Sequence, residues 1–164
     1  MKDGKTVAVV PGSFDPITFG HIDIIKRASA QYDIVYIAVM INEQKKYLFN
    51  IEERERIARE AVKNISNAVV ISSTGMLWCL AKELSADAIV KGYRNQVDYD
   101  YEMKMAEYNT AHNPDAPTVL LQANNELENI SSTTVRKILS EGNTLEKYVP
   151  KDVEKIIREI LSTR

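Results

Sequence analysis

Short apolar runs alternate along the chain with longer segments of mixed polarity. The first run, TVAVV at residues 6–10, is rich in β-branched side chains and has no polar break after Thr6. Such a run is typical of a strand that is buried on both faces. The same pattern predicts four more strands, at residues 33–42, 68–72, 87–92 and 117–123.

Between these runs, the apolar positions recur at helical spacing. Behind the first run, Ile22, Ile25 and Ala28 fall on one side of a helix that opens at Gly20-His21. A second helix is predicted behind Asn50, because Glu53 follows three residues later as in a capping box. The remaining predicted helices cover residues 76–86 after Gly75, 98–112, 131–142 and the segment from Pro150 to the end.

Strands and helices therefore alternate throughout, which is the pattern of a parallel sheet covered on both faces. We expect an α/β fold: a single Rossmann-like doubly wound domain over residues 1–164, with a five-stranded parallel sheet and helices on both faces. In such sheets, ligands bind beyond the carboxyl ends of the strands, where the strand order reverses.

Cationic and hydroxyl side chains follow the predicted strands, together with glycines and helix starts. In chain order these residues are Gly12, Ser13, Phe14, Asp15 and His21; Asn42, Lys45 and Lys46; Ser73, Thr74 and Gly75; Lys91, Gly92 and Arg94; Asn124, Asn125, Ser131, Ser132 and Thr133. Each alone has an ordinary explanation as a solvated lysine, a surface histidine or a helix cap. Gathered at one sheet edge, they favour a site for a multiply phosphorylated ligand.

Composition narrows the classes of function. Of the 164 residues, 45% are hydrophobic, which is typical of a globular protein. The net charge is -2, so the chain has no excess of positive charge that would attract nucleic acid. No apolar run approaches the roughly 20 residues that span a membrane. The one cysteine, Cys79, excludes a disulfide framework and favours the cytoplasm. The P-loop, dinucleotide-binding, zinc and nucleophile-elbow motifs are missing from the sequence.

Three separated segments carry a family resemblance: PGSFDPITFGHIDII at 11–25, KGYRNQVDYDYEMKMA at 91–106 and ISSTTVR at 130–136. They resemble the nucleotidyltransferase superfamily with the (H/T)xGH motif, which reads TFGH here. The spacing of the three segments and the residues PGSFDPIT of the first one are similar to those of the bacterial phosphopantetheine adenylyltransferases. The match runs from about residue 5 to the last helix.

The resemblance implies a reaction and its participants. ATP and 4′-phosphopantetheine would give dephospho-coenzyme A and diphosphate, with Mg²⁺ bound mainly through the ATP phosphates and not by a protein metal site. It also implies a homohexamer. The attacking phosphate is already an anion, so catalysis would depend on positioning and on stabilising charge at the transferred phosphate.

The resemblance also implies roles for individual residues. His21 would donate to the α-phosphate, and Lys45 would hold and orient the phosphate of phosphopantetheine, as the two catalytic residues. Ser13 and Phe14 would lie against the phosphates, while Leu77 and Lys91 would contact the pantetheine arm and its phosphate. The ATP side would comprise Gly92, Tyr93, Arg94, Glu102, Leu127, Glu128, Asn129, Ile130, Ser131, Ser132 and Thr133. Arg136 would brace the helix behind these serines.

The sequence departs from the family pattern at three places. Thr18 replaces the first histidine of HxGH, as is usual in this group. Lys91 replaces an arginine, which exchanges a bidentate fork for a point charge. LENISST, at 127–133, lacks the aromatic residues often found before the serines.

Two other functions remain open at this point. One is a nucleotidyltransferase of the same superfamily with nicotinamide mononucleotide or a phosphorylated alcohol as acceptor. The other is an ATP-binding sensor without turnover, which would have no need of a donor such as His21 aimed at the α-phosphate.

Overall fold

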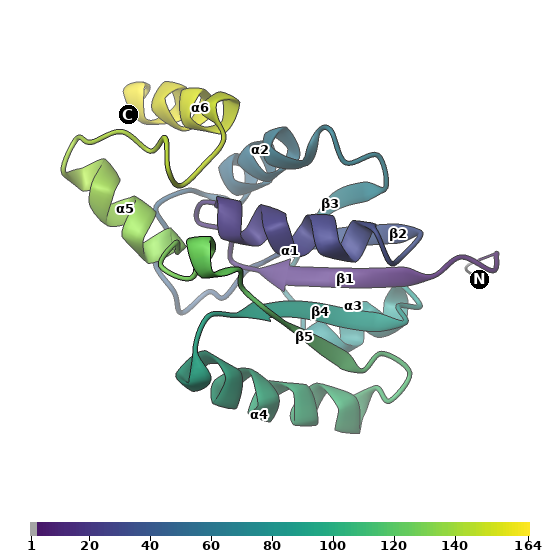
Figure 1. Cartoon of the computed structure of the whole chain (residues 1–164). Coiled ribbons are helices and arrows are strands. Elements are labelled where there is room, and N and C mark those ends of the chain that lie inside the picture. Colours follow the sequence, from purple (N-terminus) through teal and green to yellow (C-terminus); the bar gives the residue numbers. More distant parts are fainter. Residues whose placement is uncertain (1–2) are drawn as a thin grey trace.

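A five-stranded parallel sheet with the order β3-β2-β1-β4-β5 forms the centre of the fold, and it confirms the predicted fold class (Figure 1). The computed structural model describes residues 3–164. The strands are β1 (Val7–Gly12), β2 (Ile34–Met40), β3 (Ala68–Ser73), β4 (Ala88–Tyr93) and β5 (Thr118–Gln122). Each lies within two residues of its predicted position, because an apolar β-branched run is a strong signal for a buried strand.

The strand order reverses between β1 and β4, which are neighbours in the sheet but distant in the sequence. The β1–β2 ladder runs in register from Val7↔Ile34 to Gly12↔Val39. The β1–β4 ladder has only two partner pairs, Ala8↔Ala88 and Val9↔Ile89. The carboxyl ends of β1 and β4 are therefore not paired with each other, and the sheet opens there.

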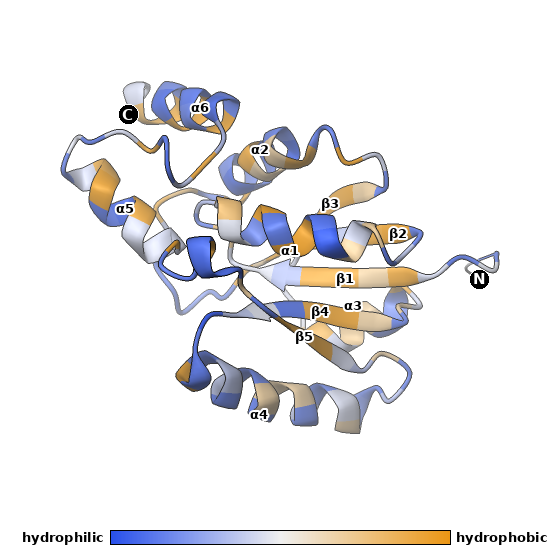
Figure 2. Ribbon diagram, viewed as in Figure 1, coloured by the Kyte–Doolittle hydropathy of each residue, from blue (hydrophilic) through white to orange (hydrophobic). Residues whose placement is uncertain are grey.

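Helices cover both faces of the sheet. They are α1 (Phe19–Ser29), α2 (Ile51–Val62), α3 (Leu77–Glu83), α4 (Gln96–His112), α5 (Ser132–Ser140) and α6 (Lys151–Ser162). The larger core joins α1, α2, α5 and α6 to one side of the strands, through residues such as Val10 and Ile37. The smaller core sets α3 against the other side, through Val9 and Ala38, and α4 packs beside α3. Figure 2 shows the apolar strands between helices of mixed polarity.

Several helix boundaries differ from the prediction. Helix α1 begins at Phe19 with Thr18 as its N-cap, so His21 is the third residue of the helix and does not open it. Helix α4 begins at Gln96, because the side chain of Asn95 caps it by accepting from the Asp98 N–H. Between the predicted strand 117–123 and the predicted helix 131–142, the chain forms a 3₁₀ turn, Asn125–Leu127. The predicted cap at Asn50 is confirmed, and Ser131, which was expected inside the helix, is the N-cap of α5.

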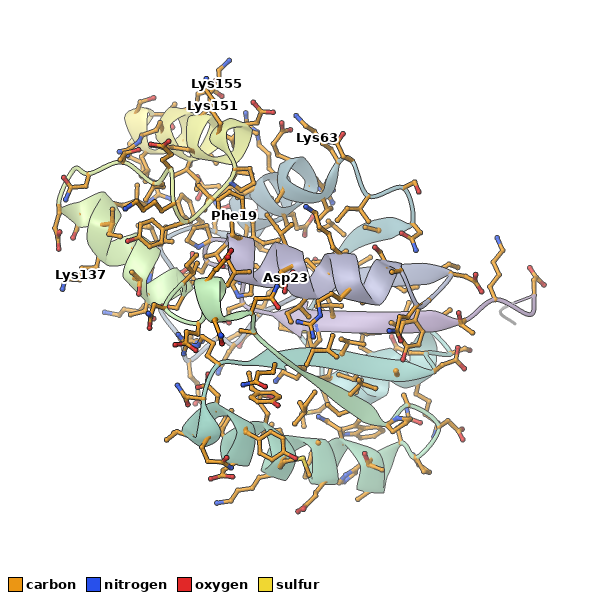
Figure 3. The ribbon with its side chains drawn as sticks, in the orientation of Figure 1. Phe19, Asp23, Lys63, Lys137, Lys151 and Lys155 are labelled. Carbon is orange, nitrogen blue, oxygen red and sulfur yellow. The ribbon has the colours of Figure 1, made fainter. Side chains whose placement is uncertain are left out.

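Helices α2 and α6 are joined at their outer surfaces. The Lys63 ammonium lies 2.9 Å from Asp152, and the Arg56 guanidinium lies 3.3 Å from Glu159. In Figure 3 Lys63, which directly follows α2, and Lys151 and Lys155 of α6 lie on the outer side, away from the sheet. The inner side of α2 carries Arg54 together with apolar residues, and this side faces the sheet. No described helix is long and apolar enough to cross a membrane.

Candidate active site

A cavity of about 530 Å³ lies at the carboxyl ends of the strands, where β1 and β4 separate. It brings together most of the predicted site residues: Ser13, Phe14, His21, Lys45, Leu77, Lys91, Gly92, Tyr93, Arg94, Glu102, Leu127, Ile130, Ser131 and Ser132. Glu128, Asn129 and Thr133 are exposed and do not line it. Neither do Ser73, Thr74 and Gly75, because β3 is the edge strand farthest from the opening on that side. The lining also includes residues that the prediction did not assign to the site: Val10, Pro11, Gly20, Ile24, Met40, Asp98, Tyr101 and Ala123.

The loop after β1 turns sharply at Phe14. This residue has a φ of 48°, and its ring is buried with 2% exposure. The ring covers Gly12, where an added Cβ would lie only 3.0 Å from a ring carbon. Gly12 therefore allows the close approach that keeps the loop tight. The same ring meets the His21 ring edge-on, with centroids 5.1 Å apart, and so helps to fix the imidazole.

The imidazole of His21 is held in one orientation by the start of its own helix. Its Nδ1 accepts a hydrogen bond from the Thr18 backbone N–H at 3.0 Å. In a neutral ring, the proton is then on Nε2. Burial, and to a smaller extent the charge of Arg94, lower the pKa of His21 from 6.5 to about 4. At neutral pH the ring is uncharged and can offer an N–H donor from a side chain that lines the cavity.

Lys45 reaches the cavity from the exposed loop after β2. Its ammonium lies 3.3 Å from the Ser13 hydroxyl and 6.0 Å from the centroid of the Tyr47 ring. The ion pairs among residues 3–164 do not include Lys45. Its positive charge is therefore available to an anion at this end of the cavity.

Two further cations line the opposite side, and carboxylates of α4 hold both of them. The Lys91 ammonium lies 2.6 Å from Glu102, and the Arg94 Nε lies 3.0 Å from Asp98. Asp98 and Glu102 are four residues apart and share one side of α4. This helix thus sets a pair of carboxylates against a pair of cations at the end of β4.

Helix α5 closes the cavity with its N-terminus. Ser131 caps the helix, since its hydroxyl accepts from the Thr134 N–H at 3.2 Å. The Ser132 hydroxyl donates to the Pro16 carbonyl at 2.7 Å, which ties the helix to the loop after β1. Arg136 donates to the Asp15 carbonyl at 2.8 Å, and this contact fits its expected bracing role. A helix N-terminus in this position favours an anion.

Asp15 joins the loops that surround the cavity. Its carboxylate is buried and accepts from the backbone N–H groups of Leu48 and Phe49, at 2.9 and 3.0 Å. It thereby holds the segment between β2 and α2 against the loop after β1. The sequence placed Asp15 at this sheet edge but gave no sign of these two backbone partners.

Arg54 is a residue at this site that sequence reasoning missed. It is only 2% exposed, and its guanidinium donates to the carbonyl of Ser13 at 2.9 Å. In a helix with many charged residues, one arginine is easily taken as solvated. The available signal was its spacing, because Arg54 lies three and four residues before the buried Ile57 and Ala58.

Comparisons with known proteins show what this chain is similar to in sequence. The sequence model of the cytidylyltransferase-like family matches residues 9–138. The phosphopantetheine adenylyltransferase of Clostridium botulinum (strain Alaska E43 / Type E3) is 43% identical over 90% of this chain and 92% of its own length. The protein of the same name from Limosilactobacillus reuteri (strain DSM 20016) is 38% identical over 96% of this chain and 91% of its own length.

Solved structures show the same fold. A chain from Vibrio parahaemolyticus has a TM-score of 0.71 at 18% identity, over 94% of this chain and 93% of its own. The nicotinic acid mononucleotide adenylyltransferase of Plasmodium falciparum has a TM-score of 0.67 at 16% identity, over 95% of this chain and 96% of its own.

Proposed function

Because this chain belongs to the cytidylyltransferase-like family and, within it, to the phosphopantetheine adenylyltransferases, we propose that it transfers the adenylyl group of ATP to 4′-phosphopantetheine. The products are dephospho-coenzyme A and diphosphate, which places the enzyme in coenzyme A synthesis. The observation that carries this proposal is the arrangement of Lys45 and His21 at one end of a cavity whose other side holds Arg94 and the start of α5.

The acceptor phosphate binds at the Lys45 end of the cavity. Lys45 and the Ser13 hydroxyl, 3.3 Å apart, hold its oxygens, and Leu77 lies along the pantetheine arm. Lys91 contacts the same phosphate from the side of β4. An oxygen of this phosphate attacks the α-phosphorus of ATP, and the bond from that phosphorus to the bridging oxygen of diphosphate breaks. The nucleophile is an anion, so no protein base has to take a proton.

His21 acts on the α-phosphate as a neutral donor. Its lowered pKa, about 4, and its bonded Nδ1 leave the Nε2–H as the group that can face a phosphate oxygen. Negative charge grows on the oxygens around the α-phosphorus as the two P–O bonds exchange. A fixed N–H donor stabilises that charge in the transition state more than in the ground state.

The ATP side is formed by β4, α4 and the segment before α5. Arg94 and the N-terminus of α5, with Ser131 and Ser132, face the β- and γ-phosphates. Gly92 and Tyr93, together with Leu127 and Ile130, lie around the nucleoside. Glu102 is on this side too, and it holds Lys91 in place at 2.6 Å.

Mg²⁺ fits this site through the nucleotide. The described residues contain no group of three His, Cys, Asp or Glu side chains that could hold a metal, and the cavity carboxylates Asp98 and Glu102 each hold a cation. Mg²⁺ commonly binds through substrate phosphates and retained water. When bound there, it would neutralise charge on the β- and γ-phosphates of the leaving group.

The experiment combines the protein, ATP, Mg²⁺ and 4′-phosphopantetheine, and follows diphosphate release and product mass. We expect dephospho-coenzyme A in equal amount to diphosphate. Nicotinate mononucleotide and a phosphorylated alcohol serve as alternative acceptors, and a higher kcat/KM for either of them would overturn the assigned acceptor. Binding of ATP without turnover of any acceptor would indicate a sensor.

The same samples test the single-displacement mechanism. The Ser and Lys side chains that line the cavity have other contacts: Ser131 caps α5, Ser132 donates to the Pro16 carbonyl, Ser13 lies beside Lys45, and Lys91 forms an ion pair with Glu102. None of them is arranged as a nucleophile beside a free base, so a covalent adenylyl-enzyme is not expected. Labelled diphosphate should therefore not exchange into ATP unless phosphopantetheine is present. Rapid exchange in its absence would contradict this mechanism.

We also propose that the protein works in the cytoplasm as a homohexamer. The support for assembly beyond the family resemblance is an exposed apolar side of α4, where Val97 is 78% exposed and Tyr101 62%. Sedimentation analysis of the purified protein tests the assembly, and a monomer at micromolar concentration would contradict it.

A further inference from the structure

Arg54 lies in the larger core although it carries a permanent positive charge. It is 2% exposed and belongs to the buried side of α2 with Ile57, Ala58 and Val62. Among residues 3–164, the ion pairs do not join its guanidinium to any carboxylate. A buried charge without a counter-ion costs free energy, and proteins rarely place one in a core unless it has a use.

The guanidinium instead donates to three backbone carbonyls from three segments. Nη1 donates to Ser13 at 2.9 Å and to Met40 at 3.2 Å, and Nε donates to Phe49 at 3.2 Å. Ser13 follows β1, Met40 ends β2, and Phe49 precedes α2. Carbonyl dipoles reduce the free-energy cost of burying the guanidinium, but they do not neutralise its charge. The region behind the cavity therefore stays positive.

Arg54 shares two neighbours with Lys45. Both cations contact Ser13, Arg54 through the carbonyl and Lys45 through the hydroxyl. Both also lie near the ring of Tyr47, with the Arg54 Cζ 3.8 Å and the Lys45 Nζ 6.0 Å from its centroid. Tyr47 is fixed in turn, because its hydroxyl accepts from the Asn42 N–H at 2.9 Å. Arg54 therefore helps to fix the positions of Ser13 and Tyr47, the two residues that lie beside the Lys45 ammonium.

The cations on the two sides of the cavity differ in their counter-ions. Lys91 and Arg94 are paired with Glu102 and Asp98, whereas Lys45 and Arg54 are not in the ion pairs of the described residues. We infer that Arg54 is a positioning residue for the acceptor phosphate: it holds the Ser13–Lys45 pair and adds a fixed positive charge behind it. This inference rests on the proposed function, since it concerns the acceptor that the reaction requires.

Three hydrogen bonds to carbonyls of three different segments require the several donors of an arginine side chain. A planar guanidinium presents five donors in a fixed fork, while an ammonium is a point charge on a flexible stem. Lysine at position 54 would keep the charge and lose part of the hydrogen bonding. Methionine would keep much of the volume and lose both. The two substitutions therefore separate the effect of charge from the effect of loop geometry.

The test measures binding of 4′-phosphopantetheine and of pantetheine, which lacks the phosphate, by calorimetry, and then steady-state kinetics. For Arg54→Met we expect roughly a tenfold or greater rise in the Kd of 4′-phosphopantetheine, the scale for losing a charge-assisted contact. The Kd of pantetheine and the Kd of ATP should change far less. Arg54→Lys should lie between the wild type and Arg54→Met.

Arg56→Met is the matched control, because Arg56 is on the same helix with an exposed side chain and pairs with Glu159 outside the site. It should change thermal stability slightly and leave both substrate constants intact. If Arg54→Met does not fold, Arg54→Lys and Tyr47→Leu still test the inference, since each should reduce the preference for the phosphorylated ligand.

The possible outcomes separate this inference from the proposed function. An active wild type whose Arg54 variants keep the same preference for 4′-phosphopantetheine over pantetheine contradicts the inference alone, even if their melting points fall. A wild type that binds both ligands equally contradicts it as well. A wild type that binds neither ligand and forms no product contradicts both proposals.

Discussion

At the scale of single residues, His21 combines a structural and a proposed chemical role in one ring. The two nitrogens divide the roles, since Nδ1 accepts from Thr18 at the start of α1 and Nε2 carries the remaining proton. The ring is neutral because burial and Arg94 lower its pKa to about 4. A neutral donor suits a group that stabilises charge on a phosphate without taking part in proton transfer.

Replacing His21 should therefore change rate and stability together. In His21→Ala, we expect kcat to fall by roughly 10²-fold, as for the loss of one fixed donor to an oxyanion. The lost contact to Thr18 should also cost about 1 kcal/mol of unfolding free energy. Steady-state kinetics and urea unfolding measure the two effects.

His21→Gln is the control, because glutamine at the third helical position can accept from the N-cap N–H in a capping box. It should recover the stability while kcat stays below the wild type. If His21→Ala loses stability but keeps its turnover number, His21 is only a helix cap.

The lowered pKa of His21 also predicts how stability depends on pH. The unfolded protein binds a proton at His21 near pH 6.5, while the folded protein does so only near pH 4. Between these values the unfolded state holds more protons, so unfolding free energy should rise with pH and be fully gained above pH 6.5. Urea unfolding from pH 4.5 to 7.5 should show a steeper slope for the wild type than for His21→Gln. Equal slopes would contradict the burial of a neutral imidazole.

At the scale of elements, α4 supplies the counter-charges for the cations at the end of β4. Asp98 and Glu102 hold Arg94 and Lys91 within the cavity lining, at 3.0 and 2.6 Å. The helix thus reduces the positive charge that Lys91 offers to a phosphate. Lys91 is both an ion-pair partner of Glu102 and a cavity residue, so substitutions are needed to distinguish a structural role from a role in binding phosphate.

Substitutions in the Lys91–Glu102 pair should change the reaction with 4′-phosphopantetheine in opposite directions. In Glu102→Gln the ammonium of Lys91 is released, so the KM for 4′-phosphopantetheine should fall several-fold. In Lys91→Ala we expect the transition state to weaken by about 2 to 4 kcal/mol, the scale for losing a desolvated charged contact. Lys91→Arg should keep activity, and Lys104→Ala, an exposed change on the same helix, should have no effect. A lower melting point with both substrate constants intact in Lys91→Ala would make Lys91 a purely structural residue.

The elements also show what the sequence can and cannot predict. The strands and helices follow from apolar periodicity, which buried surfaces impose directly on the sequence. The start of α1 at Phe19 was placed too late, because its cap is made by Thr18 and His21, and a histidine is not a usual partner in a capping box. Arg54 was missed since its use depends on carbonyls from distant segments. The pairing of Lys91 in β4 with Glu102 in α4 likewise depends on tertiary contact.

At the scale of the whole molecule, the opening of the sheet determines where the site lies. The β1–β2 ladder extends to Gly12↔Val39, whereas the β1–β4 ladder ends at Val9↔Ile89. The cavity follows from this difference, with Ser13, His21 and Lys45 on the β1–β2 side and Lys91 and Arg94 on the β4 side. The two groups of residues are joined by few backbone hydrogen bonds at this end of the sheet.

A ligand that binds in the cavity should therefore link the two sides of the opening. With a non-hydrolysable ATP analogue and Mg²⁺, we expect slower amide hydrogen exchange at Gly12–Phe14, at Lys91–Arg94 and at the start of α5. Amides in the β2–β3 ladder from Val35↔Ala68 to Ile37↔Val70, at the end of these strands away from the cavity, should exchange at the same rate with or without the analogue. Exchange depends on local opening, and a bound ligand lowers the population of open states only where it makes contact. Protection confined to the β2–β3 side, or spread evenly over the sheet, would mean that the nucleotide does not bind between β1 and β4.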